Sequence, residues 1–216
     1  MNEILDEQMN LWEQVFSEDR SAYGENPSEP AIRSAALFKG EGIQQILELG
    51  AGQGRDTLHF ARQGFSVTAV DYSRSGLAEI RRRAETAGLT HLIRAVHHDV
   101  RNAFLFDDAA FDACYSHLLF CMALTRIDLE FLFREVRRIL KPGGLNIFTV
   151  RHSGDALFDK ATHISEDLYI FDKFIVHFFD REQVSHFAQG YEVLDIAEVE
   201  EGIHLKKLFR VTLRKK

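Results

Sequence analysis

The chain has 216 residues, of which 45% are hydrophobic and 27% are charged, and its formal net charge is -7 at pH 7. These values are typical of one soluble domain that is long enough to bury a full core. Proteins that grip nucleic acid phosphates usually carry a basic face, so the acidic balance disfavours a DNA or RNA partner. We therefore expect a single domain over residues 1–216 that acts without nucleic acid.

The cysteines and the first residues indicate the compartment. Cys114 and Cys121 form no CxxC pair and lie in apolar stretches, as buried free thiols in a reducing environment do. The opening stretch, MNEILDEQMN, is acidic and amphipathic, unlike a secretory signal peptide. No apolar run approaches the roughly 18 residues that a membrane span needs. These features predict a cytoplasmic protein with no membrane partner.

Two helices are predicted near the N-terminus. Apolar residues at helical spacing predict the first helix over residues 3–16. Gly24 and two nearby prolines interrupt the pattern, and a second helix is expected to begin near residues 28–30 with a Ser or Glu cap. We expect residues 1–40 to form a helical N-terminal lid.

From residue 43 the pattern alternates between short strands and helices of roughly 10 to 15 residues, which is typical of βαβ units. Helices then cover both faces of a parallel sheet, in a three-layer α/β sandwich. We expect this core over residues 41–150. The predicted strands are 43–50, 65–71, 91–99, 111–117 and 144–150, and the predicted helices are 55–64, 74–88 and 128–140, with a turn at Pro142-Gly143-Gly144.

The alternation fails after the fifth strand. Residues 151–180 form an aromatic-rich insertion, which we expect to be irregular and to line an acceptor pocket in part. Residues 181–216 are predicted to form a short helix and then two strands that meet near Glu201 and Gly202. A terminal hairpin of this kind places at least one strand antiparallel to the others.

The stretch ILELGAGQGRD, residues 46–56, predicts a ligand site. In a doubly wound sheet the ligand lies beyond the carboxyl ends of the strands, where glycines permit a tight turn and a close approach. Asp71 ends the second strand, where a carboxylate accepts hydrogen bonds from ribose hydroxyls. Asp99 ends the third strand, in a position to receive an adenine amino group. The pattern predicts a nucleoside site.

The glycine spacing separates the possible nucleoside ligands. Dinucleotide sites use G-x-G-x-x-G, with a helix N-terminus that faces a pyrophosphate. This chain has G-x-G-x-G at Gly50, Gly52 and Gly54, flanked by the acids Glu48 and Asp56. Acids suit a cationic amino-acid group better than a pyrophosphate. The expected ligand is an adenosine that bears an ammonium and a carboxylate.

These segments resemble the class I methyltransferases that use S-adenosylmethionine. ILELGAGQG resembles the family's first motif, AVDYS its second, HHDV its third, FDACYSH its fourth-strand segment and LKPGGLNIF its entry to the fifth strand. The resemblance implies a Rossmann-like, seven-stranded, mostly parallel sheet whose last strand is antiparallel, with S-adenosylmethionine as cofactor. The residues implied in cofactor binding are Glu48, Gly50, Ala51, Gly52, Gly54, Asp71, Tyr72, Ser73, Asp99, Val100, Ser116 and, from the N-terminal lid, Tyr23.

Within that family the chain looks most similar to small-molecule enzymes of the tellurite-resistance and thiopurine-like group. The grounds are its short length, the AYGENPSE lead and the aromatic insertion. No Asn-Pro-Pro-Tyr type sequence follows the fourth strand and no Pro-Cys pair occurs, which disfavours methylation of DNA bases. The predicted function is methyl transfer to a small-molecule acceptor by in-line displacement, carried out by a monomer or homodimer.

Two histidines are candidate catalytic residues. His117 follows the fourth strand and His152 follows the fifth, and each also suits a hydrogen-bonded structural role. His97 and His98 are adjacent on a strand and so point to opposite faces, and we predict no metal site.

Two alternative functions stay open. A regulatory or partner protein that binds S-adenosylmethionine without catalysis would keep the same two acids, at positions 71 and 99. Tyr169 and Lys173 have the Y-x-x-x-K spacing of NAD(P)-dependent short-chain reductases, but the T-G-x-x-x-G-x-G pattern of those enzymes is absent.

Overall fold

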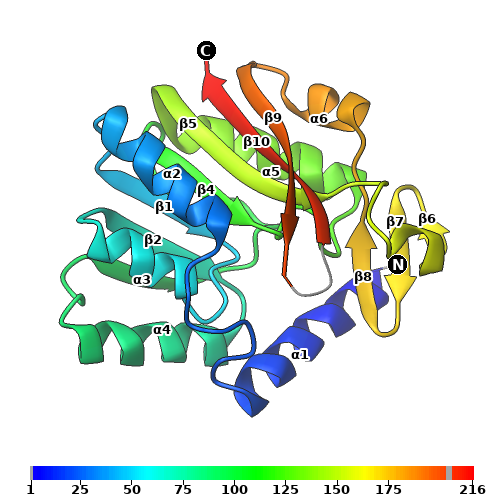
Figure 1. Cartoon of the computed structure of the whole chain (residues 1–216), viewed down its shortest axis with the longest axis horizontal. Coiled ribbons are helices and arrows are strands. Elements are labelled where there is room, and N and C mark those ends of the chain that lie inside the picture. The colour runs from blue at the N-terminus through cyan, green and yellow to red at the C-terminus, as the bar shows by residue number, and fades with distance from the viewer. Residues whose placement is uncertain (1, 203–205) are drawn as a thin grey trace.

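A seven-stranded sheet forms the centre of the computed structural model, which describes residues 2–202 and 206–216 (Figure 1). Its strands are β1 Gln45–Leu49, β2 Ser66–Asp71, β3 Ile93–His97, β4 Phe111–His117, β5 Leu140–Arg151, β9 Tyr191–Glu201 and β10 Lys206–Lys215. The order is β3-β2-β1-β4-β5-β10-β9, and β10 lies antiparallel between β5 and β9. The predicted fold class, with an antiparallel last strand, is confirmed.

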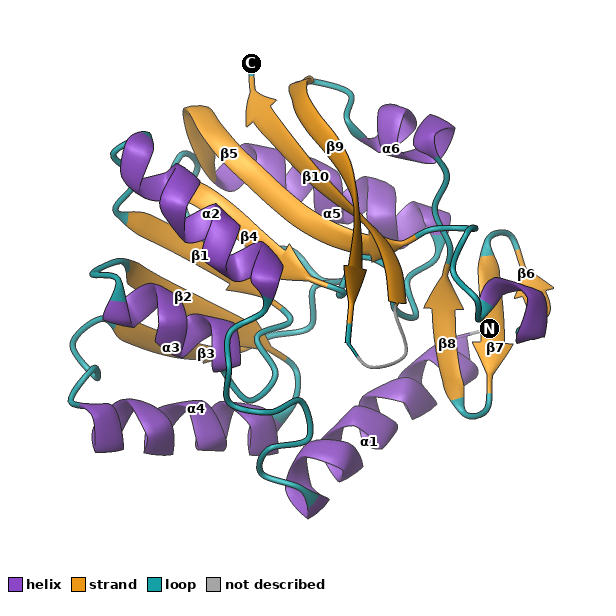
Figure 2. Cartoon of the chain, viewed as in Figure 1, coloured by secondary structure: helices purple, strands orange, loops and turns teal. Residues whose placement is uncertain are grey.

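Helices cover both faces of the sheet (Figure 2). They are α1 Asn2–Glu18, α2 Glu29–Gly40, α3 Arg55–Arg62, α4 Arg74–Ala87, α5 Arg126–Ile139 and α6 Arg181–Phe187. Side chains of β1 alternate between the two faces, as in any strand: Ile46 packs with α2 and α3, whereas Leu47 and Leu49 pack with α5. The core therefore consists of two apolar layers, one on each side of the sheet.

Short polar side chains cap the N-termini of several of these helices, α2 and α5 among them. The Ser28 hydroxyl accepts a hydrogen bond from the Ala31 N–H, and Pro30 occupies the first turn of α2, where its missing N–H costs nothing. Thr125 and Asp128 form a reciprocal capping box at the start of α5. The predicted start of the second helix near residues 28–30 is confirmed.

The predicted turn at Pro142-Gly143-Gly144 is wrong. β5 begins at Leu140, directly after α5, and runs through these residues. Gly143 has a φ of 76°, and the pairing with β4 shifts register between Phe111 and Ala113. The additional residues form a bulge within the strand, which bends it without ending it.

The insertion is ordered, contrary to the irregular segment that we predicted. After a 3₁₀ turn at Phe158–Lys160, it forms an antiparallel sheet of β6 Thr162–Ser165, β7 Leu168–Phe171 and β8 Phe174–His177. Figure 1 shows this sheet beside α1, away from the central sheet. Each strand has only four residues, too few for a clear alternation in the sequence.

The C-terminal hairpin is confirmed, although the connection at residues 203–205 lies outside the described residues. Among the helices that the structure describes, none combines the length and apolar character needed to cross a membrane.

Candidate active site

A cavity of about 410 Å³ lies at the carboxyl ends of the central strands. Its volume falls in the range of roughly 300–1,000 Å³ that is usual for small-molecule sites. The glycine loop after β1, the ends of β2, β4 and β5, helix α1 and the insertion all contribute to its wall. Of the residues predicted to bind the cofactor, those that line it are Tyr23, Glu48, Gly50, Ala51, Gly52, Gly54, Asp71, Tyr72 and Val100.

The glycine loop packs tightly against the protein itself. Gly54 has a φ of 82°, and a Cβ there would lie 2.6 Å from the Ile80 side chain. A Cβ at Gly76, in the first turn of α4, would lie 2.6 Å from the carbonyl oxygen of Gly52. Glycine is therefore required at Gly54 by both conformation and packing. The packing role of Gly76 was not predicted, because one glycine inside a helical pattern gives no such signal.

Asp71 holds the loop in place. Its Oδ2 accepts a hydrogen bond from the Gly52 N–H at 2.8 Å, and its Oδ1 accepts one from the Ser73 N–H at 2.8 Å. Burial raises the pKa of Asp71, although these backbone hydrogen bonds oppose the shift. A carboxylate has about four acceptor positions. Asp71 therefore keeps acceptor capacity toward a ligand in the cavity.

Two further acids lie beneath the glycine loop. Burial, reinforced by the neighbouring charge of Asp56, raises the pKa of Glu48 well above its ordinary range. Asp56 accepts hydrogen bonds from the N–H and hydroxyl of Ser28 and from the Tyr115 hydroxyl. A cationic ligand group would stabilise the ionised form of Glu48. This half of the cavity can therefore receive a cationic ligand group.

Asp99 does not line the cavity. Its carboxylate accepts hydrogen bonds from the Arg101 guanidinium, at 2.8 to 3.2 Å, and Arg101 also reaches Asp6 on α1. Its neighbours His98 and Val100 do line the cavity. The predicted contact of Asp99 with adenine stays a prediction, because in this structure the Asp99 carboxylate forms an ion pair with Arg101.

Helix α1 covers the cavity. Trp12 and Phe16 line it, and Tyr23, in the segment that follows, packs against Trp12 in a tilted arrangement with 5.9 Å between ring centroids. Glu13 accepts hydrogen bonds at 2.6 Å from the hydroxyls of both Ser73 and Ser75. The predicted site residue Ser73 thus attaches α1 to α4, and its side chain stays outside the cavity wall.

The same helix is fastened to the insertion. The Gln8 amide donates to the Lys173 carbonyl at 2.9 Å and accepts from the Ile175 N–H at 3.0 Å. On the other side, the Gln53 amide of the glycine loop donates to the carbonyl of Asp19, just after α1. Helix α1 and the segment that follows it are therefore hydrogen-bonded to both the glycine loop and β8.

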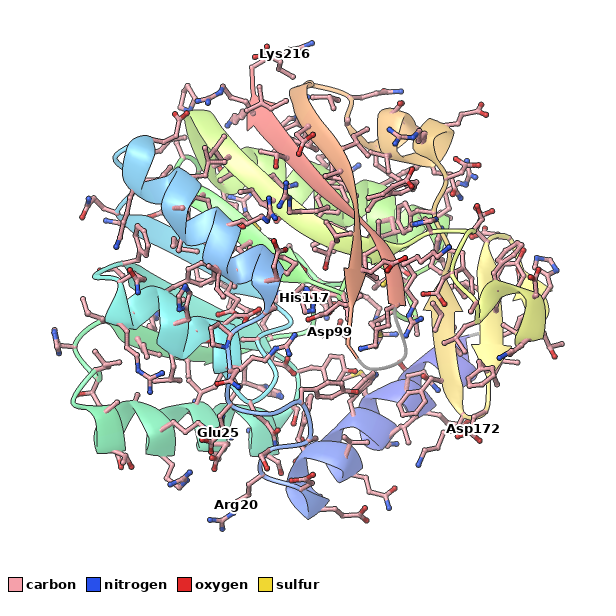
Figure 3. All side chains as sticks on the ribbon, in the orientation of Figure 1. Arg20, Glu25, Asp99, His117, Asp172 and Lys216 are labelled. Carbon is pink, nitrogen blue, oxygen red and sulfur yellow. The ribbon has the colours of Figure 1, made fainter. Side chains whose placement is uncertain are left out.

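His117 lies at the end of β4 near the centre of the molecule (Figure 3) and lines the cavity. Both of its ring nitrogens have neighbours. Nδ1 lies 2.9 Å from the Thr149 hydroxyl, and Nε2 lies 2.9 Å from Oε2 of Glu201. The second contact is close but does not meet hydrogen-bond geometry. Burial alone would raise the pKa of Glu201, but His117, Arg55 and Lys206 bring it to about 2.

Besides Ser73 and Asp99, two further predicted residues, Ser116 and His152, lie outside the cavity wall. The His152 ring stacks on Phe209, with 4.5 Å between centroids, and its Nδ1 accepts from the Gly154 N–H. Burial lowers the pKa of His152. Ser116 is fully buried, and its hydroxyl has no hydrogen-bond partner among the described residues. The structure therefore gives His152 a packing role and does not support the expectation that it faces the acceptor.

Tyr169 and Lys173, which have the spacing of a short-chain reductase, do not line the cavity either. Tyr169 packs on Phe158 and Phe178, and Lys173 lies in the turn between β7 and β8. Within residues 2–202 and 206–216, no group of three His, Cys, Asp or Glu side chains is placed to hold a metal ion.

Four charged residues of the site were missed by the sequence analysis. Arg55, Arg151 and Lys206 line the cavity, and Glu201 pairs with Arg55 at 3.1 Å. A signal existed for Arg151, which ends β5 just as Asp71 ends β2. Glu201 and Lys206 lie in a hairpin whose charged residues are typical of solvated strands, so their burial could not be seen.

The comparisons with known proteins point to one family. Residues 46–144 match the model described as a methyltransferase domain. The chain is 31% identical over 113 residues to the putative methyltransferase YqeM of Bacillus subtilis (strain 168). The aligned region covers 50% of this chain and 43% of that protein. It is 26% identical over 111 residues to the probable S-adenosyl-L-methionine-dependent methyltransferase TehB of Haemophilus influenzae, with 51% and 37% covered.

A solved structure with the same fold is that of the 1,6-didemethyltoxoflavin-N1-methyltransferase of Burkholderia thailandensis, bound to 1,6-didemethyltoxoflavin and S-adenosylhomocysteine. It superposes with a TM-score of 0.76 over 97% of this chain and 87% of that chain, at 19% identity. The sheet order is that of a Rossmann-like fold. The methyltransferase model matches less than half of the chain, and these similarities together support a class I methyltransferase domain whose cofactor is S-adenosylmethionine. The matches span less than half the length of the curated relatives above.

Proposed function

We propose that this chain transfers a methyl group from S-adenosylmethionine to a small-molecule acceptor. The observation that carries the proposal is the division of one cavity into two chemically different halves. Glu48, Asp71 and the glycine loop form an acidic half at the ends of β1 and β2. His117 and Arg151 form part of a second half at the ends of β4 and β5, which we assign to the acceptor.

S-adenosylmethionine supplies an already activated methyl group on its sulfonium. The chain therefore has to align the two reactants and exclude water, and such orientation can contribute roughly 7–11 kcal/mol to the barrier reduction. In this proposal Asp71 accepts ribose hydroxyls and Glu48 faces the amino-acid part. Trp12 and Phe16 close the cavity with aromatic faces, which favour a nearby cation.

His117 is proposed to position the hairpin rather than to accept a proton directly. Its two nitrogens face Thr149 and Glu201 at 2.9 Å each, so a free nitrogen toward the acceptor would require one of these contacts to break. Acceptors that need no dedicated base, such as thiols, suit this arrangement.

The test is formation of S-adenosylhomocysteine, measured by mass spectrometry, with methyl-labelled cofactor and a panel of thiols, phenols and organic acids. We expect turnover with at least one acceptor, and a loss of at least 100-fold in Asp71→Ala but not in the exposed control Asp107→Ala. Cofactor binding without turnover on any acceptor would favour the non-catalytic alternative, a regulatory or partner protein.

A further inference from the structure

Three cationic side chains gather at one end of the cavity. Arg55 begins α3, Arg151 ends β5 and Lys206 begins β10. The side chains of Arg55 and Arg151 are only 22% and 11% exposed. Cationic side chains are seldom buried to this extent without matching negative charge. The cofactor site alone does not explain this cation cluster, which we define as Arg55, Arg151 and Lys206.

The nearby carboxylates pair with the two arginines of the cation cluster. Asp155 lies 2.9 Å from Arg151, whereas Glu201 and Asp56 lie 3.1 and 3.8 Å from Arg55. Lys206 has no carboxylate within 4.0 Å among the described residues, and its Nζ lies 5.9 Å from the Tyr23 ring centroid. Burial lowers the pKa of Lys206, against the opposing effect of Glu201. Among the residues that the structure describes, Lys206 is therefore left without a carboxylate partner, and an anionic ligand group would supply one.

The sheet order separates the cation cluster from the acids of the cofactor half. Glu48 and Asp71 belong to β1 and β2, whereas β5 and β10 lie two and three strands from β1 on the other side. At about 4.8 Å per strand, this places them on the order of 10 and 14 Å from β1. Arg55 directly follows the glycine loop and borders both halves. Arg151 and Lys206 belong to the second half.

The insertion contributes an apolar wall. Its residues that line the cavity are Leu157, Phe171, Phe174 and Val176. The Phe174 ring also packs against Trp12 of α1, with 5.2 Å between centroids. A ligand in this half would meet apolar side chains along its body and two cations at one end.

We propose that the acceptor is a small organic acid, whose carboxylate is bound by Lys206 and Arg151 and whose apolar body lies against Phe171 and Phe174. This proposal rests on the proposed methyl transfer. An anionic acceptor is also attracted to a cavity that holds a sulfonium, because the opposite charges favour their joint binding.

The experiment uses the whole protein saturated with S-adenosylhomocysteine. Benzoate, phenylacetate, 3-phenylpropionate and their hydroxyl derivatives are titrated by calorimetry, each beside its neutral amide. The variants are Lys206→Met, Lys206→Arg and Arg151→Met, with Lys207→Met as a matched control, because the Lys207 side chain is exposed. Affinity for S-adenosylhomocysteine is measured on every variant first.

We expect at least one acid to bind tenfold or more tightly than its amide. Lys206→Met and Arg151→Met should lose that preference, whereas Lys206→Arg and Lys207→Met should keep it, with S-adenosylhomocysteine affinity within about twofold throughout. Equal binding of acids and amides, or no binding of any acid at millimolar concentration, overturns the proposal while the cofactor still binds. A loss of S-adenosylhomocysteine affinity confined to Lys206→Met and Arg151→Met also overturns it, because the cations then serve the cofactor carboxylate. Failure of the wild-type protein to bind S-adenosylhomocysteine at all would instead refute the proposed methyl transfer.

Discussion

The carboxylate of Asp71 and the backbone N–H of Gly52 are joined by a hydrogen bond of 2.8 Å, which links the end of β2 to the loop after β1. The second carboxylate oxygen accepts from the Ser73 N–H. One side chain therefore fixes the shape of the glycine loop and the start of α4 together. It does so at the position where an acid is also expected to bind the cofactor ribose.

Replacing this carboxylate with an amide tests both roles. In Asp71→Asn an NH2 group faces one of the two backbone donors, so one buried N–H loses its acceptor. We expect the free energy of unfolding to fall by about 1–3 kcal/mol, and the affinity for S-adenosylhomocysteine to fall by at least tenfold. Urea denaturation and calorimetry measure the two effects. Asp107→Asn, at an exposed position, should change neither, and wild-type affinity in Asp71→Asn would refute the cofactor role.

Gly54 and Gly88 provide a matched pair for the packing of the glycine loop. Both have a positive φ, 82° and 68°, but a Cβ at Gly54 would lie 2.6 Å from Ile80, whereas nothing lies within 4 Å at Gly88. Alanine in the left-handed region costs roughly 1–2 kcal/mol at either position. We expect Gly54→Ala to lower the melting temperature several degrees more than Gly88→Ala. Equal losses would show that the Ile80 side chain moves aside at little cost in stability.

Glu13 is predicted to keep α1 over the cavity. Glu13→Ala removes the acceptor of the Ser73 and Ser75 hydroxyls, so α1 should open more often. We expect faster hydrogen exchange in α1 and a roughly tenfold loss of S-adenosylhomocysteine affinity, mainly through faster dissociation. Glu7→Ala changes an exposed residue of the same helix and serves as the control. Identical dissociation rates in the two variants would mean that α1 does not limit release.

Glu201 gives a pH-dependent prediction. Its pKa is about 2 in the folded protein, against an ordinary value of 4.5. A depressed carboxyl pKa stabilises the fold above pH 4.5, by at most about 3 kcal/mol, and this contribution is lost as the pH falls from 4.5 toward 2. The stability difference between wild type and Glu201→Gln should therefore be large at pH 7 and pH 5 and smaller at pH 3. Glu200→Gln should show no such trend, and a difference for Glu201→Gln that does not vary with pH would contradict the assigned pKa.

Much of the fold could be predicted from the sequence because its signals are local. The strand that ends at Asp71 and the helix that begins after Ser73 follow from apolar periodicity and a capping residue. The glycine loop and the acids that flank it, Glu48 and Asp56, lie in one short stretch, so this part of the cavity wall could be predicted.

The acceptor half could not be predicted in the same way. Arg151 and Lys206 are 55 positions apart in the sequence and meet only because β10 pairs with β5. Whether such charged residues are buried depends on tertiary packing, and the sequence of the strand alone does not predict it. Asp99 is a different case, because its carboxylate accepts hydrogen bonds from Arg101, only two positions along the chain.

The central claim is that the acidic, glycine-lined half of the cavity binds S-adenosylmethionine. The most direct test is calorimetric titration of the wild-type protein and Asp71→Ala with S-adenosylmethionine, S-adenosylhomocysteine and NADPH. We predict micromolar binding of the first two ligands, loss of both in Asp71→Ala, and no binding of NADPH. Binding of NADPH alone would contradict the claim and return attention to Tyr169 and Lys173.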